Sequence, residues 1–118
     1  MPPTNGVPPV NGRRPHGGLL MEVVAVLHRE PHLSDLAVGA TLGVSEQAVE
    51  RARRTLLIPA AYQRRRKGAE IDSGLGRCSR CPPDRARWIS LDPGVRRIDC
   101  AVCGGPIYLT SVRLRYTS

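Results

Sequence analysis

The chain has 118 residues, and a chain of this length forms one domain or two very small ones. Eighteen Lys and Arg residues against ten Asp and Glu residues give a net charge of +8, and all but one of the basic residues are Arg. Because the guanidinium fork matches phosphate oxygens and base edges, this charge favours a polyanionic partner. Aromatic residues make up only 3% of the chain, which argues against a roomy apolar substrate pocket. No apolar run approaches the roughly 20 residues of a membrane span, so we expect a cytoplasmic protein with no membrane partner.

The first predicted elements are an arm and a helix. Residues 1–18 hold five prolines among Asn and Gly residues, a composition that predicts a disordered arm because it buries too little apolar area to offset its ordering entropy. Between Leu19 and Leu27 the apolar residues recur at the spacing of one stripe of an α-helix. Pro31 ends this helix, because its ring cannot continue the helical backbone.

Two shorter helices follow, each with a serine at its expected N-cap position. Ser34 precedes an apolar pattern that runs to Gly43, the residue best able to adopt the left-handed turn that ends a helix. Ser45 precedes a third pattern, which ends at Pro59. The apolar stripe of this third helix consists of Ala48, Val49, Ala52 and Leu56.

The junction between the second and third helices carries a turn motif. Leu42, Gly43, Val44 and Ser45 give an apolar residue, a turn glycine, a second apolar residue and a helix cap. Over residues 34–57 the chain resembles the helix-turn-helix of bacterial transcription regulators, although that pattern favours Ala where this chain has Gly39. The resemblance implies a three-helix unit over residues 19–58 that places its third helix in the major groove of DNA. The alternative is a three-helix packing unit that does not contact DNA.

By the same resemblance, the outward side chains of the third helix would contact base edges. Gln47 suits adenine and Arg51 suits guanine, because their paired donors and acceptors match those bases. Two acidic residues stand on this face. Glu50 could pair with Arg54, and Glu46 could accept a hydrogen bond from cytosine. The alternative is that these acidic residues belong to a helix that faces a protein. The full set of expected base contacts is Glu46, Gln47, Glu50, Arg51 and Arg54.

A basic stretch without any acidic residue runs from Arg51 to Lys67. Its second half lies in residues 59–76, for which we expect a basic arm or a β-wing beside the DNA groove. A wing requires a hairpin over residues 60–72 with its turn at Lys67 and Gly68, and the alternative is a solvated linker. The expected phosphate contacts are Arg53, Arg64, Arg65, Arg66 and Lys67.

Four cysteines form the strongest motif of the chain. Cys78 and Cys81 make one C-x2-C pair, and Cys100 and Cys103 make a second pair after eighteen intervening residues. Each pair forms a knuckle that can present two sulfurs to one ion, and four thiolates leave no open position for a catalytic water, so we expect one structural Zn²⁺. The alternatives are a rubredoxin-type iron site, a redox dithiol pair and two disulfides. An iron carrier is usually acidic and rich in aromatic residues, and disulfides are rare in the cytosol.

Three predicted strands accompany the knuckles. Residues 88–91 and 95–99 are expected to form a hairpin around the turn at 92–94, and residues 107–115 a third strand. With its knuckles, the segment at 77–118 resembles a zinc ribbon. We expect Trp88 in the ribbon core, and the alternative is a flat, exposed Trp88 beside Arg87 that stacks on single-stranded nucleic acid.

Together these elements predict an α+β chain, in which a three-helix helix-turn-helix unit is followed by a small three-stranded antiparallel zinc ribbon. The predicted function is sequence-specific binding of double-stranded DNA in transcription regulation, by a non-enzymatic protein with one Zn²⁺ and with a homodimer as one option. Two alternatives stay open: an adaptor that docks on RNA polymerase or replication machinery through the ribbon, and a protein that binds RNA or single strands. No Gly-rich phosphate loop or Ser/His/Asp set argues for catalysis.

Overall fold

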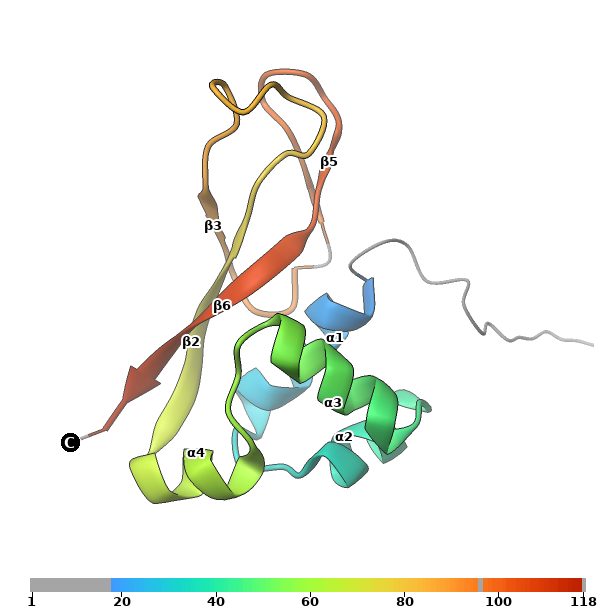
Figure 1. Cartoon of the computed structure of the whole chain (residues 1–118), viewed down its shortest axis with the longest axis vertical. Coiled ribbons are helices and arrows are strands. Elements are labelled where there is room, and N and C mark those ends of the chain that lie inside the picture. Colours follow the sequence, from blue (N-terminus) through green and yellow to red (C-terminus); the bar gives the residue numbers. More distant parts are fainter. Residues whose placement is uncertain (1–17, 96, 118) are drawn as a thin grey trace, which may run out of the picture.

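A computed structural model of the chain describes residues 18–95 and 97–117, and in these residues helices come first and strands follow. The predicted α+β class is confirmed (Figure 1). The predicted arm at 1–18 lies outside the described residues except for Gly18, which begins the first helix. No helix in the described ranges is long and apolar enough to cross a membrane. The helices are α1 (Gly18–Arg29), α2 (Asp35–Leu42), α3 (Glu46–Thr55) and α4 (Ala61–Lys67), and the strands are β2 (Ala69–Gly76), β3 (Ile89–Leu91), β4 (Ile98–Asp99), β5 (Pro106–Ile107) and β6 (Leu109–Tyr116).

The caps of α2 and α3 are those that the sequence predicts. The Ser34 hydroxyl accepts a hydrogen bond from the Ala37 amide at 3.2 Å, and the Ser45 hydroxyl accepts one from the Ala48 amide at 3.1 Å. Each bond satisfies one of the amides that the first turn of a helix leaves without a partner. Gly43 ends α2 in the left-handed region with φ 73°, where a side chain would be strained.

Close packing at the α2–α3 junction explains why Gly39 stands where Ala would be expected. A Cβ built on Gly39 would lie 2.6 Å from the carbonyl oxygen of Val44, well inside van der Waals contact. The Val44 amide also donates to the Gly39 carbonyl at 3.0 Å, which holds the two segments at this separation. In this chain the crossing is too tight for a methyl group.

The predicted wing at residues 60–72 is wrong. Residues 61–67 form α4, and Gly68 ends that helix with φ 63° where the hairpin turn was expected. Five of its seven residues are Gln, Arg or Lys, which are good helix formers, so helix propensity prevails over the weak alternation of this stretch. The basic segment is therefore a helix followed by a strand, and neither a flexible arm nor a wing.

The strand after α4 changes the predicted sheet. β2 is the central strand of an antiparallel sheet with the order β3-β2-β6, and its pairing with β6 runs from Ala69 opposite Tyr116 to Gly76 opposite Leu109. β4 pairs instead with β5 in a separate two-stranded sheet. The predicted hairpin of residues 88–91 and 95–99 is therefore wrong, because β3 and β4 belong to different sheets.

One large hydrophobic core joins the helices to the long strands. Val24 of α1, Val38 of α2 and Val49 of α3 are buried in the same cluster as Ile71 of β2 and Leu109 of β6. A second, smaller cluster surrounds the cysteines and contains Cys78, Cys81 and Ile107 as its buried members. The loops that carry this second cluster form the end of the molecule opposite α4, and residues 77–90 and 99–107 are called the tip below (Figure 1). Leu91 and Val95, which lie between these two segments, pack in the main core instead. A boundary at residue 76 would therefore cut through the main core, because residues on both sides of it contribute to that core.

Candidate functional site

The tip brings the four predicted cysteines together. Their sulfur atoms all lie within 4.8 Å of one another, with Cys78 Sγ 3.5 Å from Cys103 Sγ and Cys81 Sγ 3.7 Å from Cys100 Sγ. Cys78 and Cys81 are buried, Cys100 is half-buried and Cys103 is exposed. Each of these two short distances is between a cysteine of the first knuckle and a cysteine of the second, so the four sulfurs of the two knuckles surround a common centre.

The separations fit a tetrahedral metal site. Four sulfurs at about 2.3 Å from a central zinc ion lie about 3.8 Å from one another, close to the shorter separations of this cluster. Amides of the second knuckle also point at its sulfurs: Val102 donates to Cys100 Sγ and Gly105 donates to Cys103 Sγ, both at 3.4 Å. Such donors stabilise thiolates, which are the form that binds a metal. The four cysteines can therefore hold one metal ion.

The electrostatics of the cluster differ from one cysteine to the next. Backbone amides of Cys103 and Val102 lower the pKa of Cys100 to about 6. The pKa of Cys81 is raised to about 12, first by its hydrogen bond with Cys103 and then by burial. Four clustered sulfurs cannot all lose their protons without a cation between them, because the negative charges repel one another. This distribution is the one expected of a site built for a cation.

The second candidate site is the outward face of α3. Gln47 and Arg51 are exposed, lie one helical turn apart, and neither side chain has a hydrogen-bond or ion-pair partner among residues 18–95 and 97–117. Glu46 is also exposed, whereas Glu50 is half-buried and pairs with the exposed Arg54 at 2.8 Å. Glu50 and Arg54 therefore neutralise each other on this face.

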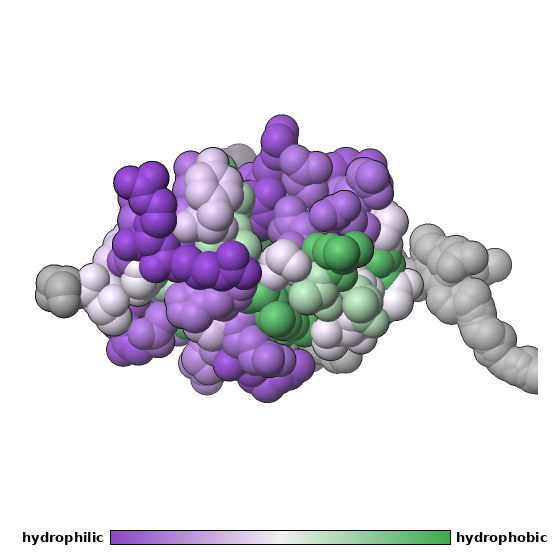
Figure 2. Space-filling view, turned by 90° about the horizontal axis from the view of Figure 1, so that it is seen from below, coloured by the Kyte–Doolittle hydropathy of each residue, from purple (hydrophilic) through white to green (hydrophobic). Residues whose placement is uncertain are grey.

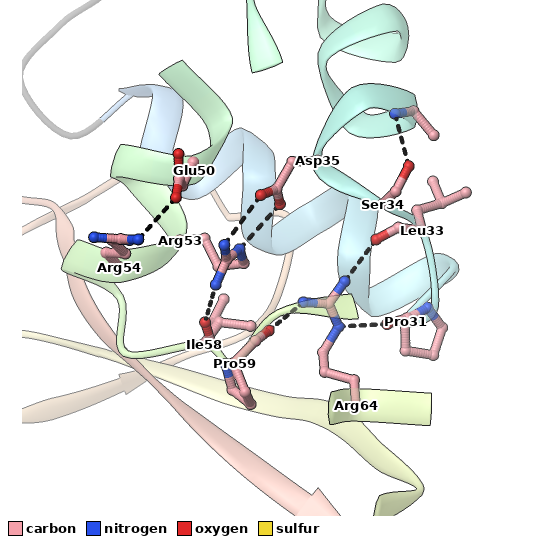
Figure 3. A network of polar contacts seen from close by, with 11 residues as sticks. Pro31, Leu33, Ser34, Asp35, Glu50, Arg53, Arg54, Ile58, Pro59 and Arg64 are labelled. Carbon is pink, nitrogen blue, oxygen red and sulfur yellow. Dashed lines mark hydrogen bonds and ion pairs between the residues drawn. The ribbon is translucent and has the colours of Figure 1, made fainter. Parts of the chain in front are cut away.

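Arg53 does not belong to the exposed surface and its expected contact with phosphate is wrong. Only 8% of Arg53 is exposed, and its Nε and Nη2 atoms donate to the two carboxylate oxygens of Asp35, each at 3.0 Å (Figure 3). The remaining Nη1 donates to the Ile58 carbonyl at 3.1 Å. The guanidinium therefore ties α3 to the start of α2, because its forked donors match a carboxylate.

Arg64 is likewise an internal residue, so its expected contact with phosphate is also wrong. Its side chain is fully buried, and its three nitrogen atoms donate to the carbonyls of Pro31, Leu33 and Pro59 (Figure 3). Burial and then the nearby positive charge of Arg53 lower the pKa of Arg64 to about 10, so the guanidinium remains charged at neutral pH. Sequence reasoning missed this role, because nothing in a run of three arginines distinguishes the one that points inward.

Three of the expected phosphate contacts stay accessible. Arg65, Arg66 and Lys67 are exposed on α4, and Arg65 also donates to the His32 carbonyl at 2.9 Å. Seen from the helical end, the surface is hydrophilic over most of its area, with one apolar area among the polar side chains (Figure 2). The exposed cations of α3 and α4 are therefore Arg65, Arg66 and Lys67 on α4 and Arg51 and Arg54 on α3.

Trp88 lies at the surface of the tip, and the expectation that it fills the ribbon core is wrong. Its side chain is 54% exposed, and the Arg77 guanidinium carbon lies 5.0 Å from the ring centroid, within the range of a cation–π interaction. Ile107 takes the core position beside the cysteines instead. No known protein family, curated protein or solved structure matches this chain.

Proposed function

We propose that the protein binds double-stranded DNA sequence-specifically, with α3 in the major groove, and that it acts in transcription regulation. The observation that carries the proposal is the pair Gln47 and Arg51 on α3, which are exposed, one turn apart and free of partners among the described residues. Amide and guanidinium groups are the side chains that read adenine and guanine through two hydrogen bonds. Their position on one helical face lets both reach neighbouring bases.

The rigidity of α3 supports this role. Base discrimination requires a helix that does not rotate against its supports, and α3 is held by its Ser45 cap, by buried Val49 and Ala52, and by the Arg53 bond to Asp35. The exposed Arg65, Arg66 and Lys67 of α4 would supply charge for the DNA backbone, which fixes position without reading sequence. Reading of bases and binding of phosphates are thereby assigned to different helices.

We further propose that the ion held by the four cysteines is Zn²⁺ and that its role is structural. Four thiolates in a tetrahedral set suit zinc, and they leave no open position for water or substrate. The metal would take the place of an apolar core in the tip, whose buried cluster contains only Cys78, Cys81 and Ile107.

The test is selection of preferred sites from a random duplex pool by the zinc-loaded full chain. We expect one enriched sequence, and we expect Gln47→Ala and Arg51→Ala each to weaken binding by about 1–3 kcal/mol at one particular base pair. The matched control is Arg66→Ala on α4. It should weaken all duplexes alike and reduce the slope of log K against log salt by about 0.9.

Two outcomes would contradict the proposal. If selection enriched no sequence, the protein would not recognise DNA sequence-specifically. An enriched sequence that is unchanged in both α3 variants would show that another element reads the bases.

A further inference from the structure

The tip contains an exposed indole whose position the metal site does not explain. Trp88 is the single Trp of the chain, and more than half of its side chain is accessible to solvent. Single exposed apolar side chains are common on protein surfaces, so exposure alone does not indicate a ligand, but an indole offers a broad planar face on which another ring can stack. Arg77 lies over one face of the ring at 5.0 Å, so a stacking ligand would use the other face.

A hollow of about 420 Å³ lies beside this ring. Pro83 and Ala86 contribute apolar wall beside the sulfurs of Cys78 and Cys81, while Arg77 brings a positive charge and Ser79 a hydroxyl. Small-molecule and cofactor sites usually have about 300–1,000 Å³ and combine an apolar wall with a few polar groups. The hollow is therefore large enough for one planar group that stacks on Trp88 while its polar substituents reach Arg77 and Ser79.

The loop that forms the hollow carries more positive than negative charge, even beside a Zn²⁺ with four thiolates, whose net charge is −2. Between residues 77 and 88 the tip has four arginines and one acidic residue, Asp84. The aliphatic part of Arg80 packs over Gly105, next to Cys103, and Arg80 lines neither this hollow nor the neighbouring one. Arg85 and Arg87 are exposed and line a neighbouring hollow, and neither has an ion-pair partner in the described part of the chain. Arg77, Arg85 and Arg87 are thus available to an anionic ligand.

We propose that the tip binds single-stranded nucleic acid, with one unpaired base stacked on Trp88 in this hollow and with Arg77, Arg85 and Arg87 facing the phosphates. The ligand class follows from the combination of a flat aromatic ring, an adjacent guanidinium and a positive border, because every nucleotide has a planar base joined to an anion. The site lies at the opposite end of the molecule from α4 and is independent of the proposed contact of α3 with duplex DNA (Figure 1).

The uniqueness of Trp88 provides the measurement. Its fluorescence reports on this site alone, since no other Trp contributes to the emission of the full chain. We would titrate the zinc-loaded protein at low salt with oligothymidylate and oligouridylate of about ten nucleotides, and with a hairpin whose loop is replaced by a non-nucleotide linker, so that every base is paired. We expect saturable quenching by a single strand and little by the hairpin, and the difference between the two single strands identifies DNA or RNA as the preferred source.

Variants locate the binding. By anisotropy of a labelled single strand, we expect Trp88→Ala to weaken binding about 5- to 150-fold and Trp88→Phe to have an intermediate effect, because a phenyl ring offers a smaller stacking surface. Arg77→Gln should weaken binding and increase solvent exposure of the ring. The matched charge control is Arg66→Gln on α4, which should leave the quenching by a single strand almost unchanged.

The outcomes separate this proposal from the proposed duplex recognition. Gln47→Ala with Arg51→Ala should leave quenching by single strands intact even if duplex selection is lost. The proposal is overturned if neither single strand quenches Trp88 at low salt, if the paired hairpin quenches equally, or if Trp88→Ala binds single strands as tightly as the natural chain. Zinc content and helical circular dichroism of each variant confirm that the tip and helices are folded.

Discussion

Replacement of Arg64 by Ala is expected to be the most damaging substitution on the basic helix α4. Arg64 is fully buried and donates to the carbonyls of Pro31 and Leu33 in the α1–α2 connection and of Pro59 in the α3–α4 connection. Ala removes all three bonds together with the volume of the side chain. Three carbonyl oxygens would then lose their partners, and a cavity would remain beneath the helix.

The magnitude follows from these bonds. A hydrogen bond to a charged donor contributes about 1.5–3 kcal/mol to stability. The loss of three such bonds would be partly offset, because the structure around the variant relaxes and water enters to bind the carbonyls. We therefore expect Arg64→Ala to lower the free energy of unfolding by about 3–5 kcal/mol, within the range for breaking a buried charged contact. A protein of this size has a total stability of about 5–15 kcal/mol, so the loss is a large fraction of the whole.

The assay is urea unfolding of the zinc-loaded protein at neutral pH, followed by helical circular dichroism. Arg65→Ala is the matched control, because Arg65 is the next residue of α4 and is exposed. It should cost less than about 1 kcal/mol. Arg64→Lys should fall between the two, since an ammonium cannot reach three separate carbonyls with the geometry of a guanidinium. If Arg64→Ala and Arg65→Ala were equally stable, the three carbonyl contacts would not stabilise the fold.

Three further predictions concern the α2–α3 crossing and the metal site. Gly39→Ala should destabilise the protein by about 1–2 kcal/mol in urea, because the clash of its Cβ with the Val44 carbonyl outweighs the helix propensity that Ala gains; a stabilised variant would show that the crossing can relax. Zinc binding at pH 7 should release at least one proton, from Cys81 with its pKa of about 12, and almost none from Cys100 with its pKa of about 6, so affinity should rise with pH above 7 and fall steeply as pH drops through 6. Calorimetry in buffers of different ionisation enthalpy measures this release, and a value of zero at pH 7 would contradict the assignment. Removal of the metal by a chelator should shift amide resonances of the tip while those of α1, α3 and the β2–β6 pairing stay dispersed, because the main core holds the latter; collapse of all resonances together would show one cooperative unit.

Local signals in the sequence predicted α1, α2, α3 and the clustering of the four cysteines, but not α4. A serine cap, a left-handed glycine and an apolar stripe are all determined within about ten residues, so α2 and α3 begin where expected and α2 ends before Gly43, whereas α3 ends at Thr55 and not at Pro59. The C-x2-C pairs are equally local, and the expectation that four thiolates can share one cation predicted that the two pairs come together.

The sheet was not predictable in the same way. β2 and β6 pair across more than thirty intervening residues, and neither strand carries a signal that identifies the other as its partner. The segment that became β2 holds two glycines and only two large aliphatic residues, so its pattern resembles a linker. The roles of Arg53 and Arg64 were hidden for a related reason, because burial of an arginine depends on carbonyls and carboxylates that come from distant segments.

The pairing of β2 with β6 also has a consequence for the order of folding. Gly76 and Leu109 are partners at the tip end of the ladder, and the chain between them contains all four cysteines. An ion that joins Cys78 to Cys103 would reduce the free length of this loop to about a quarter. Because loop-closure entropy costs about 0.6 kcal/mol for each doubling of length, the ion would lower the cost of bringing the two strands together by about 1.2 kcal/mol. Metal binding would thus accelerate the pairing of β2 with β6 by shortening the loop between them, and the sheet would form more slowly in a refolding mixture without metal.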